Sequence, residues 1–582
     1  MHIRGKKMER IIANEGKSGY HIVTSQFAHE AELYAASQLK IYLEKASFAV
    51  IPYFSDRCEK RTPEIRVGRN VRGNTDKLYG IGDEGFKIYT DGEDIVICGR
   101  TPRGTVYGVY RFLEEIIGFR CFTEDIEAFD KRGKIAVSDI DITENPSFEY
   151  RDTYFRGAFD CDYAVKNRLN SSLALIPNEK GGRTKFYNFH HSFYDILPPD
   201  IYFDEYYSLV DGVRLKQNGQ LCLTNEDAVN EAIKRVKEWI RIRPDCKVFS
   251  VAQNDWSNNC TCPKCRETDE KEGSPSGSII YFVNRIAEEI EKEYPDVLIH
   301  TFAYQYSRKA PKFIRPRDNV IVRLCNIECS WDENLREKKA NSPESYTAEF
   351  VGNITDWGKI SKHLYIWDYA CNFSYYILPF PNYYILADNL RYYKECGVSG
   401  ILEQGNFSYG AATGLAELEA YLCARLMWNT DLDVKELIME FTDGVYGRSA
   451  DYIRQYIELL CSEVKGKGLS LYYKPDTDFI SEALINKADE LFKKASNAAE
   501  TAEIKERIER EYLSVRFLKI CWMPLGTEGR NDLIDELYRD VKKHGISEIQ
   551  ERVNLEISFE RLRKYPFCRE KGENYRLYYI MK

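Results

Sequence analysis

The feature that most constrains the fold is an alternation of short apolar segments with amphipathic helical segments between residues 146 and 430. Apolar side chains at helical spacing predict helices over 228–240 and 279–290. Near-continuous apolar strands separated by helices are typical of a parallel sheet that is covered on both faces. We therefore expect an α/β fold built on a (β/α)8 barrel, irregular where the connections 177–219 and 307–318 lack a clear helix. The expected strands are eight extended runs, at 148–155, 171–177, 219–225, 246–255, 296–304, 319–328, 363–370 and 397–405.

Patterns of two other kinds flank this region. The N-terminal part mixes short strand-like runs with two helical patterns, and its sequence GFKIYTDGEDIVICG predicts a β-hairpin about Asp91-Gly92. The C-terminal part has successive amphipathic helical patterns and almost no strand signal. The sequence thus predicts a small α+β domain at 1–145, a catalytic barrel at 146–430 and a helical domain at 431–582.

Charge and apolar patterning exclude several kinds of partner. The net charge is −9 and no Lys/Arg cluster is present, which argues against a nucleic-acid or anionic-membrane partner. No apolar run approaches the length of a membrane span, and no signal-peptide pattern is visible at the start of the sequence. We therefore expect a cytoplasmic protein whose 17 cysteines are mostly reduced, small apolar side chains.

Four acidic residues follow or end predicted strands of the barrel: Asp255, Glu328, Asp368 and Glu403. Barrel enzymes place their active sites at the C-terminal ends of the strands. Glycosidic cleavage needs carboxyl groups about an oxocarbenium-like centre, one of them kept protonated by an apolar setting. Glu328 and Glu403 are the leading candidates for the general acid, and Asp255 and Asp368 for charge stabilisation or substrate orientation. For any one of them, capping a helix or pairing with arginine is an equally good interpretation.

Polar and aromatic side chains at the same strand ends are candidates for substrate binding. The stretch 367–384 is dense in aromatic rings and fits a wall on which sugars stack, although half of these rings are expected to pack beneath the loop. A histidine at 190 or 191 can bind a sugar hydroxyl or brace a loop. The substrate-binding candidates are His191, Asn254, Trp256, Tyr304, Arg323, Trp367, Tyr369 and Asn372.

Three thiols, Cys260, Cys262 and Cys265, lie close enough in sequence to share a metal ion. A structural zinc site needs four ligands, and no CxxC or HxxxH partner follows at finger spacing, so a metal is disfavoured here. The sequence has no GxSxG elbow, P-loop, HExxH motif or dinucleotide-binding fingerprint. We expect no cofactor.

Longer stretches resemble a known family. RTPRGTVYGVYRFLEEIIGFRCFTEDIE, at 100–127, resembles the end of the small α/β domain that precedes the barrel in β-hexosaminidases and α-glucuronidases. HHSFYDILPP, QNDWSNNCTCPKC, WDYACNFSYYILPFPN and GILEQG look like successive signatures of the domain-of-unknown-function family DUF4838. Part of that group is classed as glycoside hydrolase family 163, with endo-β-N-acetylglucosaminidase activity on complex N-glycans.

The resemblance implies a retaining hydrolase that uses substrate-assisted catalysis, in which the 2-acetamido oxygen of the sugar attacks the anomeric carbon. It implies an oligosaccharide or glycan as partner and leaves open which of Glu328 and Glu403 is the acid. Two alternatives remain. One is a hydrolase of uronic-acid glycosides, with Arg323 receiving the sugar carboxylate. The other is a glycan-binding protein without activity on a hydrolase fold.

Overall fold

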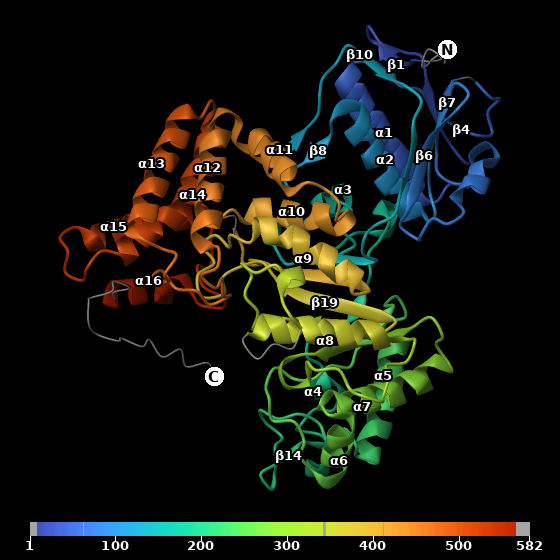
Figure 1. Ribbon diagram of the computed structural model, residues 1–582. Coiled ribbons are helices and arrows are strands. Elements are labelled where there is room, and N and C mark those ends of the chain that lie inside the picture. Colours follow the sequence, from blue (N-terminus) through green and yellow to red (C-terminus); the bar gives the residue numbers. More distant parts are fainter. Residues whose placement is uncertain (1–8, 62, 341–344, 411–412, 566–582) are drawn as a thin grey trace.

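The computed structural model of the protein describes residues 9–61, 63–340, 345–410 and 413–565. Figure 1 shows N-terminal strands and helices, a central region about a parallel sheet, and a group of C-terminal helices. The expected domains at 1–145 and 431–582 extend beyond these ranges at both ends of the chain. None of the helices in the described part of the chain is long and apolar enough to cross a membrane.

The N-terminal region has a mixed six-stranded sheet in the order β11-β6-β7-β5-β3-β4 and a smaller sheet β10-β1-β2. The predicted hairpin is confirmed, since β6 pairs antiparallel with β7 and Gly92 takes a φ of 63° in the turn. Helix α2 begins after Thr101, whose side chain accepts from the Gly104 N–H, and ends at Gly118 with a φ of 64°. The elements are β1 (Arg10–Asn14), β2 (Lys17–Ser18), β3 (His21–Thr24), α1 (Glu30–Ser47), β4 (Tyr53–Ser55), β5 (Glu64–Val67), β6 (Phe86–Asp91), β7 (Asp94–Gly99), α2 (Pro102–Ile117), β8 (Arg120–Cys121), β9 (Glu127–Ala128), β10 (Lys134–Val137) and β11 (Asp141–Glu144).

The central region is built on a seven-stranded, all-parallel sheet in the order β12-β20-β19-β18-β17-β16-β13. The sheet curls so far that its two edge strands approach one another, with the Tyr150 ring of β12 centred 5.2 Å from the Phe186 ring of β13. Its strands are β12 (Tyr150–Thr153), β13 (Phe186–Tyr187), β16 (Val248–Ser250), β17 (Leu298–Ala303), β18 (Val320–Cys325), β19 (His363–Tyr369) and β20 (Val398–Gln404).

The sheet has seven strands where the sequence predicts eight. Within the described residues, 171–177 and 219–225 form no strand of this sheet, whereas β13 arises in a connection that showed no strand pattern. Between the two edges lies Asn170, whose N–H donates to the carbonyl of Arg151 and whose carbonyl accepts from Thr184. At 171–177 the side chains explain the difference: Ser171 and Ser172 hydrogen bond to Asp152, so this segment turns instead of extending.

Helices cover the outer side of this sheet where the apolar spacing predicts them. Helix α5 buries Ala228, Val229, Ala232 and Val236, and α7 buries the apolar side chains between Ile279 and Ile290. The helices of the central region are α3 (Cys161–Lys166), α4 (Phe193–Ile196), α5 (Glu226–Ile242), α6 (Pro263–Glu272), α7 (Ser276–Glu291), α8 (Tyr346–Ile360), α9 (Tyr383–Glu395) and α10 (Ala416–Trp428), and a short hairpin is formed by β14 (Leu209–Val210) and β15 (Val213–Arg214).

The described residues of the C-terminal region form helices joined by loops and no strand, as the sequence pattern indicates. In Figure 1 these helices stand beside the central region as a separate orange and red group. They are α11 (Val434–Tyr446), α12 (Ala450–Val464), α13 (Glu482–Ala498), α14 (Ala502–Cys521), α15 (Arg530–Lys543) and α16 (Leu555–Lys564).

Candidate active site

Side chains that follow the C-terminal ends of the parallel strands meet above the concave face of the curled sheet. Close contacts link them in a chain: Tyr154 to His190 at 3.0 Å, His191 to Asp255 at 3.6 Å, and Asp255 to Tyr304 at 3.0 Å. We call this group the mouth and define it as Tyr154, His190, His191, Asp255, Tyr304, Glu328, Trp367 and Tyr369. Strand ends are where a curled parallel sheet offers backbone and side chains to a ligand.

Arg323 forms the floor beneath the mouth. It lies on β18 with none of its surface exposed, and its guanidinium nitrogens have no hydrogen-bond partner among the described residues. Its charge is instead surrounded by aromatic faces, a favourable arrangement for a cation. The rings lie 4.7–5.8 Å from the guanidinium carbon and belong to Tyr150, Phe186, Phe189, Tyr365 and Trp367. Arg323 is therefore out of reach of a substrate carboxylate, contrary to the role that the sequence suggested.

The two adjacent histidines differ in their contacts. The His190 ring is open to solvent on one side and packed against Phe189 and Trp367 on others. Burial by this crowding, then repulsion from His191 and Arg323, lowers the pKa of His190 to about 4, so the ring is neutral near pH 7. His191 lies 2.6 Å through Nδ1 from the Gln253 carbonyl, and its Nε2 faces Asp255. The carbonyl fixes the proton on Nδ1, which leaves Nε2 to accept a hydrogen bond.

Asp255 is the most accessible acid of the mouth. Its Oδ1 accepts a hydrogen bond of 3.0 Å from the Tyr304 hydroxyl, and its side chain is 57% exposed. Its two chain neighbours brace the loop: the Asn254 Nδ2 and the Trp256 Nε1 both donate to the carbonyl of Gly219. Of the predicted binding residues here, Asn254 is thus buried with its side-chain amide hydrogen bonded to Gly219, whereas Trp256 is 36% exposed.

Glu328 lies in a more polar setting than its flanking cysteines suggest. Its carboxylate pairs with the Arg308 guanidinium at 2.5 Å, and the same guanidinium reaches Glu349 at 3.2 Å. The side chain is 30% exposed. Arg308 thus bridges Glu328 to Glu349 of α8 and holds the Glu328 side chain beside the mouth.

Aromatic rings of the predicted wall pack beside the mouth on one side, where Tyr369, Phe373 and Tyr376 are each at most 7% exposed. Tyr369 contacts Phe373, which contacts Tyr376, with ring centres 5.7 and 6.4 Å apart. Trp367 closes the row at the sheet and donates from Nε1 to Gln404. Other rings of 367–384 pack away from the mouth, for example Tyr375 against Phe517. Asn372 is buried and binds the carbonyl of Tyr473, so it shapes this loop and offers nothing to a ligand.

The C-terminal region contributes residues that sequence reasoning missed. Tyr472 contacts Phe373, and the backbone N–H of Glu551 donates to the carbonyl of Phe373. Burial raises the pKa of Glu551, with Glu548 and Asp255 adding to the rise and Arg552 opposing it. The exposed Arg552 also lowers the pKa of both mouth histidines, after larger effects of burial. No local signal could have found these residues, because their place depends on how the helices dock.

Two of the four predicted acids lie away from the mouth. Asp368 and Glu403 are in register on β19 and β20, and alternate with Trp367 and Gln404, which face the mouth. Asp368 accepts hydrogen bonds from Asn326, Trp331 and Tyr393 on the outer side of the sheet. Glu403 is fully buried there, and neither carboxyl oxygen has a partner among the described residues. Both assignments as strand-end catalytic acids are therefore corrected. Successive side chains of a strand point to opposite faces, so Asp368 and Glu403 point toward the covering helices and not toward the mouth.

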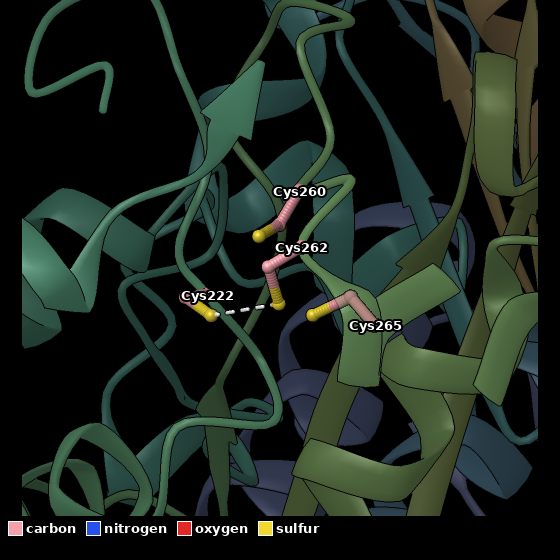
Figure 2. A group of neighbouring side chains, drawn as sticks. All are labelled: Cys222, Cys260, Cys262 and Cys265. Carbon is pink, nitrogen blue, oxygen red and sulfur yellow. Dashed lines mark hydrogen bonds between the residues drawn. The ribbon is translucent and has the colours of Figure 1, made fainter. Parts of the chain in front are cut away.

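The cysteine cluster lies at the far end of the loop that follows Asp255. Cys222 joins Cys260, Cys262 and Cys265, and all four are buried with their sulfur atoms within 4.8 Å of one another (Figure 2). The fourth thiol, which the sequence spacing did not supply, comes from about 40 residues upstream. Among the described residues, this is the one group of His, Cys, Asp or Glu side chains whose ligand atoms lie close enough to share a metal ion.

Comparisons with known proteins point to one family and one fold. A family model described as a domain of unknown function, DUF4838, matches residues 121–458, which is more than half of the chain. No curated protein matches the chain in sequence. Among solved structures, a family GH115 4-O-methyl-α-glucuronidase with specificity for decorated arabinogalactans is similar with a TM-score of 0.58 at 11% identity, over 92% of this chain and 77% of that one.

Two further structures are similar at lower scores. One is CpGH84B, with a TM-score of 0.48 at 12% identity, over 96% of this chain and 98% of that one. The other is the GH20 β-N-acetylhexosaminidase from Streptomyces coelicolor A3(2), with a TM-score of 0.44 at 12% identity, over 75% of this chain and 92% of that one.

Proposed function

The chain belongs to the DUF4838 family, and on that premise we propose that it is a glycoside hydrolase whose active site is the mouth. One observation carries the proposal: carboxyl groups of Asp255 and Glu328 follow the ends of parallel strands beside a row of aromatic rings. Carboxyl groups supply the proton transfer and charge stabilisation that glycosidic cleavage needs. The partly exposed Trp256, next to Asp255 in the chain, offers an aromatic face suited to a sugar ring. The fold shared with a solved glucuronidase supports the same class of reaction.

The proposed substrate is a glycan containing N-acetylhexosamine, cleaved with retention. In this scheme the acetamido oxygen of the sugar attacks the anomeric carbon while an acid protonates the leaving oxygen. Asp255 is suited to hold the acetamido N–H, since Tyr304 fixes its carboxylate and leaves it accessible. His191, with Nε2 free to accept, lies beside the same carboxylate and suits a sugar hydroxyl.

Two carboxyl groups fit the role of proton donor. Glu328 follows β18 directly but pairs with Arg308. Glu551 lies beside the mouth: its backbone N–H donates to the Phe373 carbonyl, and its carboxyl group is close enough to interact with the charge of Asp255. Burial raises the pKa of Glu551, which favours the protonated form that a general acid requires. We assign proton donation to Glu551 first and to Glu328 second.

The test is a comparison of single variants on a panel of aryl glycosides and N-glycans. Asp255→Asn and Glu551→Gln are each expected to lose about 100-fold or more in kcat, the usual effect of removing an acid–base group. Glu328→Gln shows the larger loss if the order of the two acids is reversed. Glu560→Gln, which removes an exposed acid of the same region that pairs with Lys564, is the control. Full activity in Asp255→Asn, Glu551→Gln and Glu328→Gln alike would exclude this site.

A second substrate class is favoured by a specific observation. Arg552 places an exposed cation near both mouth histidines, where a uronic-acid carboxylate could pair with it. A thiazoline inhibitor separates the two classes, since only an enzyme assisted by the acetamido group binds it tightly. Glycan binding without turnover on either substrate class would instead indicate a binding protein on this fold.

A further inference from the structure

Four cysteine side chains converge in a part of the molecule that has little other packing. Cys222 follows the β14–β15 hairpin, Cys260 and Cys262 lie in the loop after β16, and Cys265 lies in the first turn of α6. Figure 2 shows the four side chains pointing toward a common centre. We propose that they bind one Zn²⁺ ion as a structural site with four thiolate ligands.

The sulfur positions fit a tetrahedral ion. Zn–S bonds are about 2.3 Å long, so the sulfur atoms of a tetrahedral site lie about 3.8 Å apart. Here the Sγ atoms of Cys222 and Cys262 are 3.6 Å apart, and all four lie within 4.8 Å of one another. Small side-chain adjustments bring every pair to the required spacing. Because the protein supplies all four ligands, the site has no open position for catalysis.

The surroundings suit the negative charge of four thiolates about Zn²⁺. The backbone N–H of Leu209 points at the Cys260 Sγ over 3.3 Å, and the Arg214 guanidinium lies 3.9 Å from the same atom. The Thr224 hydroxyl is 3.2 Å from the Cys265 Sγ. Cys262 is the N-cap residue of α6, so the positive end of that helix faces the cluster. Such donors to the ligand atoms orient and stabilise a metal site.

Simple apolar packing accounts poorly for this cluster. The four cysteines form an apolar group separate from the main core, and one partly buried side chain, that of Leu209, packs against it among the described residues. If these cysteines served only as small apolar side chains, we would expect them to pack as part of the main core. Here the thiols themselves are the core of a local unit.

The site would fasten the loop that carries Asp255. From residue 198 to 225 the described chain has no helix or strand longer than three residues. At its end, Gln220 and Gly219 hold Asn254 and Trp256 by hydrogen bonds, on either side of Asp255. A metal that ties Cys222 to residues 260–265 closes both segments into one unit, as metals do for other parts with a small apolar core.

Metal analysis of the purified full-length protein tests the proposal. Wild type, purified without chelators, is expected to carry one zinc ion per chain. The four thiols release their protons to solvent on binding, so a thiol-blocking mercurial should release the zinc to a colorimetric chelator. Cys222→Ser is expected to carry no zinc above background. Cys246→Ser, which removes a buried cysteine outside the cluster, is the matched control and should keep it.

Replacement by Co²⁺ gives a readout that does not depend on a variant that folds. A tetrahedral four-thiolate site should show intense cobalt bands and thiolate-to-cobalt charge transfer in wild type. No bound zinc, iron in its place, or disulfides among the four cysteines on non-reducing peptide mapping would overturn the proposal. The result is independent of the proposed glycosidase activity, because metal content is measured without substrate.

Discussion

Glu403 carries a carboxyl group that the fold buries between β20 and the helices outside it. Burial, followed by repulsion from Asp368 and Glu419, raises the pKa of Glu403 well above 4.5. The folded protein therefore keeps this proton at pH values where the unfolded chain releases it. The free energy of unfolding must then fall as pH rises from about 4.5 toward the folded pKa.

Glu403→Gln should remove this pH-dependent loss of stability. The variant is expected to unfold at a higher temperature than wild type at pH 7, with the difference shrinking toward pH 4, because the amide stays neutral throughout. The turnover proposed for the mouth should remain, since the Glu403 side chain faces away from it. Thermal unfolding across this pH range together with kcat measures both. Loss of turnover in a variant that folds normally would return Glu403 to the active site.

At the residue scale, the sequence predicts four acids at the strand ends, and the structure turns two of them, Asp368 and Glu403, away from the mouth. Asp255 and Glu328 were placed at the mouth, where the structure has them. Asp368 and Glu403 required knowledge of which strand face turns inward, and the apolar runs of β19 and β20 are buried on both faces. A strand with two buried faces carries no alternation from which its inner side can be predicted.

At the element scale, the position of β20 in the sheet depends on Gly400, which has no side chain. Gly400 lies beside the stacked rings of Tyr150 and Tyr365, which are 5.6 Å apart. A Cβ at Gly400 would come within 2.7 Å of the Tyr365 ring. The concave face of the sheet closes over these rings because position 400 leaves room for them.

Gly400→Ala should therefore strain the sheet. The added methyl group is expected to lower the free energy of unfolding by about 1–3 kcal/mol, as overpacking of a filled core does. Urea unfolding measures the change. Gly133→Ala is the control, since a Cβ at that position meets no atom within 4 Å. Equal stability of the two variants would show that the rings shift freely.

At the scale of the whole molecule, buried ion pairs join the N-terminal region to the sheet. Glu84 accepts from Arg103 of its own region and from Arg151 of β12, and Asn170 donates to it over 2.9 Å. Burial raises the pKa of Glu84, but Arg151 and Arg103 outweigh this and hold it at about 2. The Glu84 side chain is 11% exposed, so solvent screens these pairs little.

Glu84→Gln should weaken the contact between the N-terminal region and the sheet and so lower the free energy of unfolding. A pKa lowered from 4.5 to about 2 stabilises the fold by about 3 kcal/mol above pH 4.5, and this is lost as pH falls from about 4.5 to about 2. The variant is expected to lose this amount at pH 7 and to change less in acid. Glu115→Gln, which breaks a more exposed pair with Arg111, should cost under about 1 kcal/mol. A loss at pH 7 no larger than that of the control would contradict the prediction.

The sequence by itself determined the α/β class, the positions of most strands and helices, and the strand ends that carry Asp255 and Glu328. These follow from local periodicity, which records burial along one segment at a time. Tertiary structure alone decided that Cys222 completes the thiol cluster and that Tyr472, Glu551 and Arg552 reach the mouth. It also decided that Arg323 lies beneath rings from several strands. The physical reason is that such contacts join segments far apart in sequence, and packing between elements sets them.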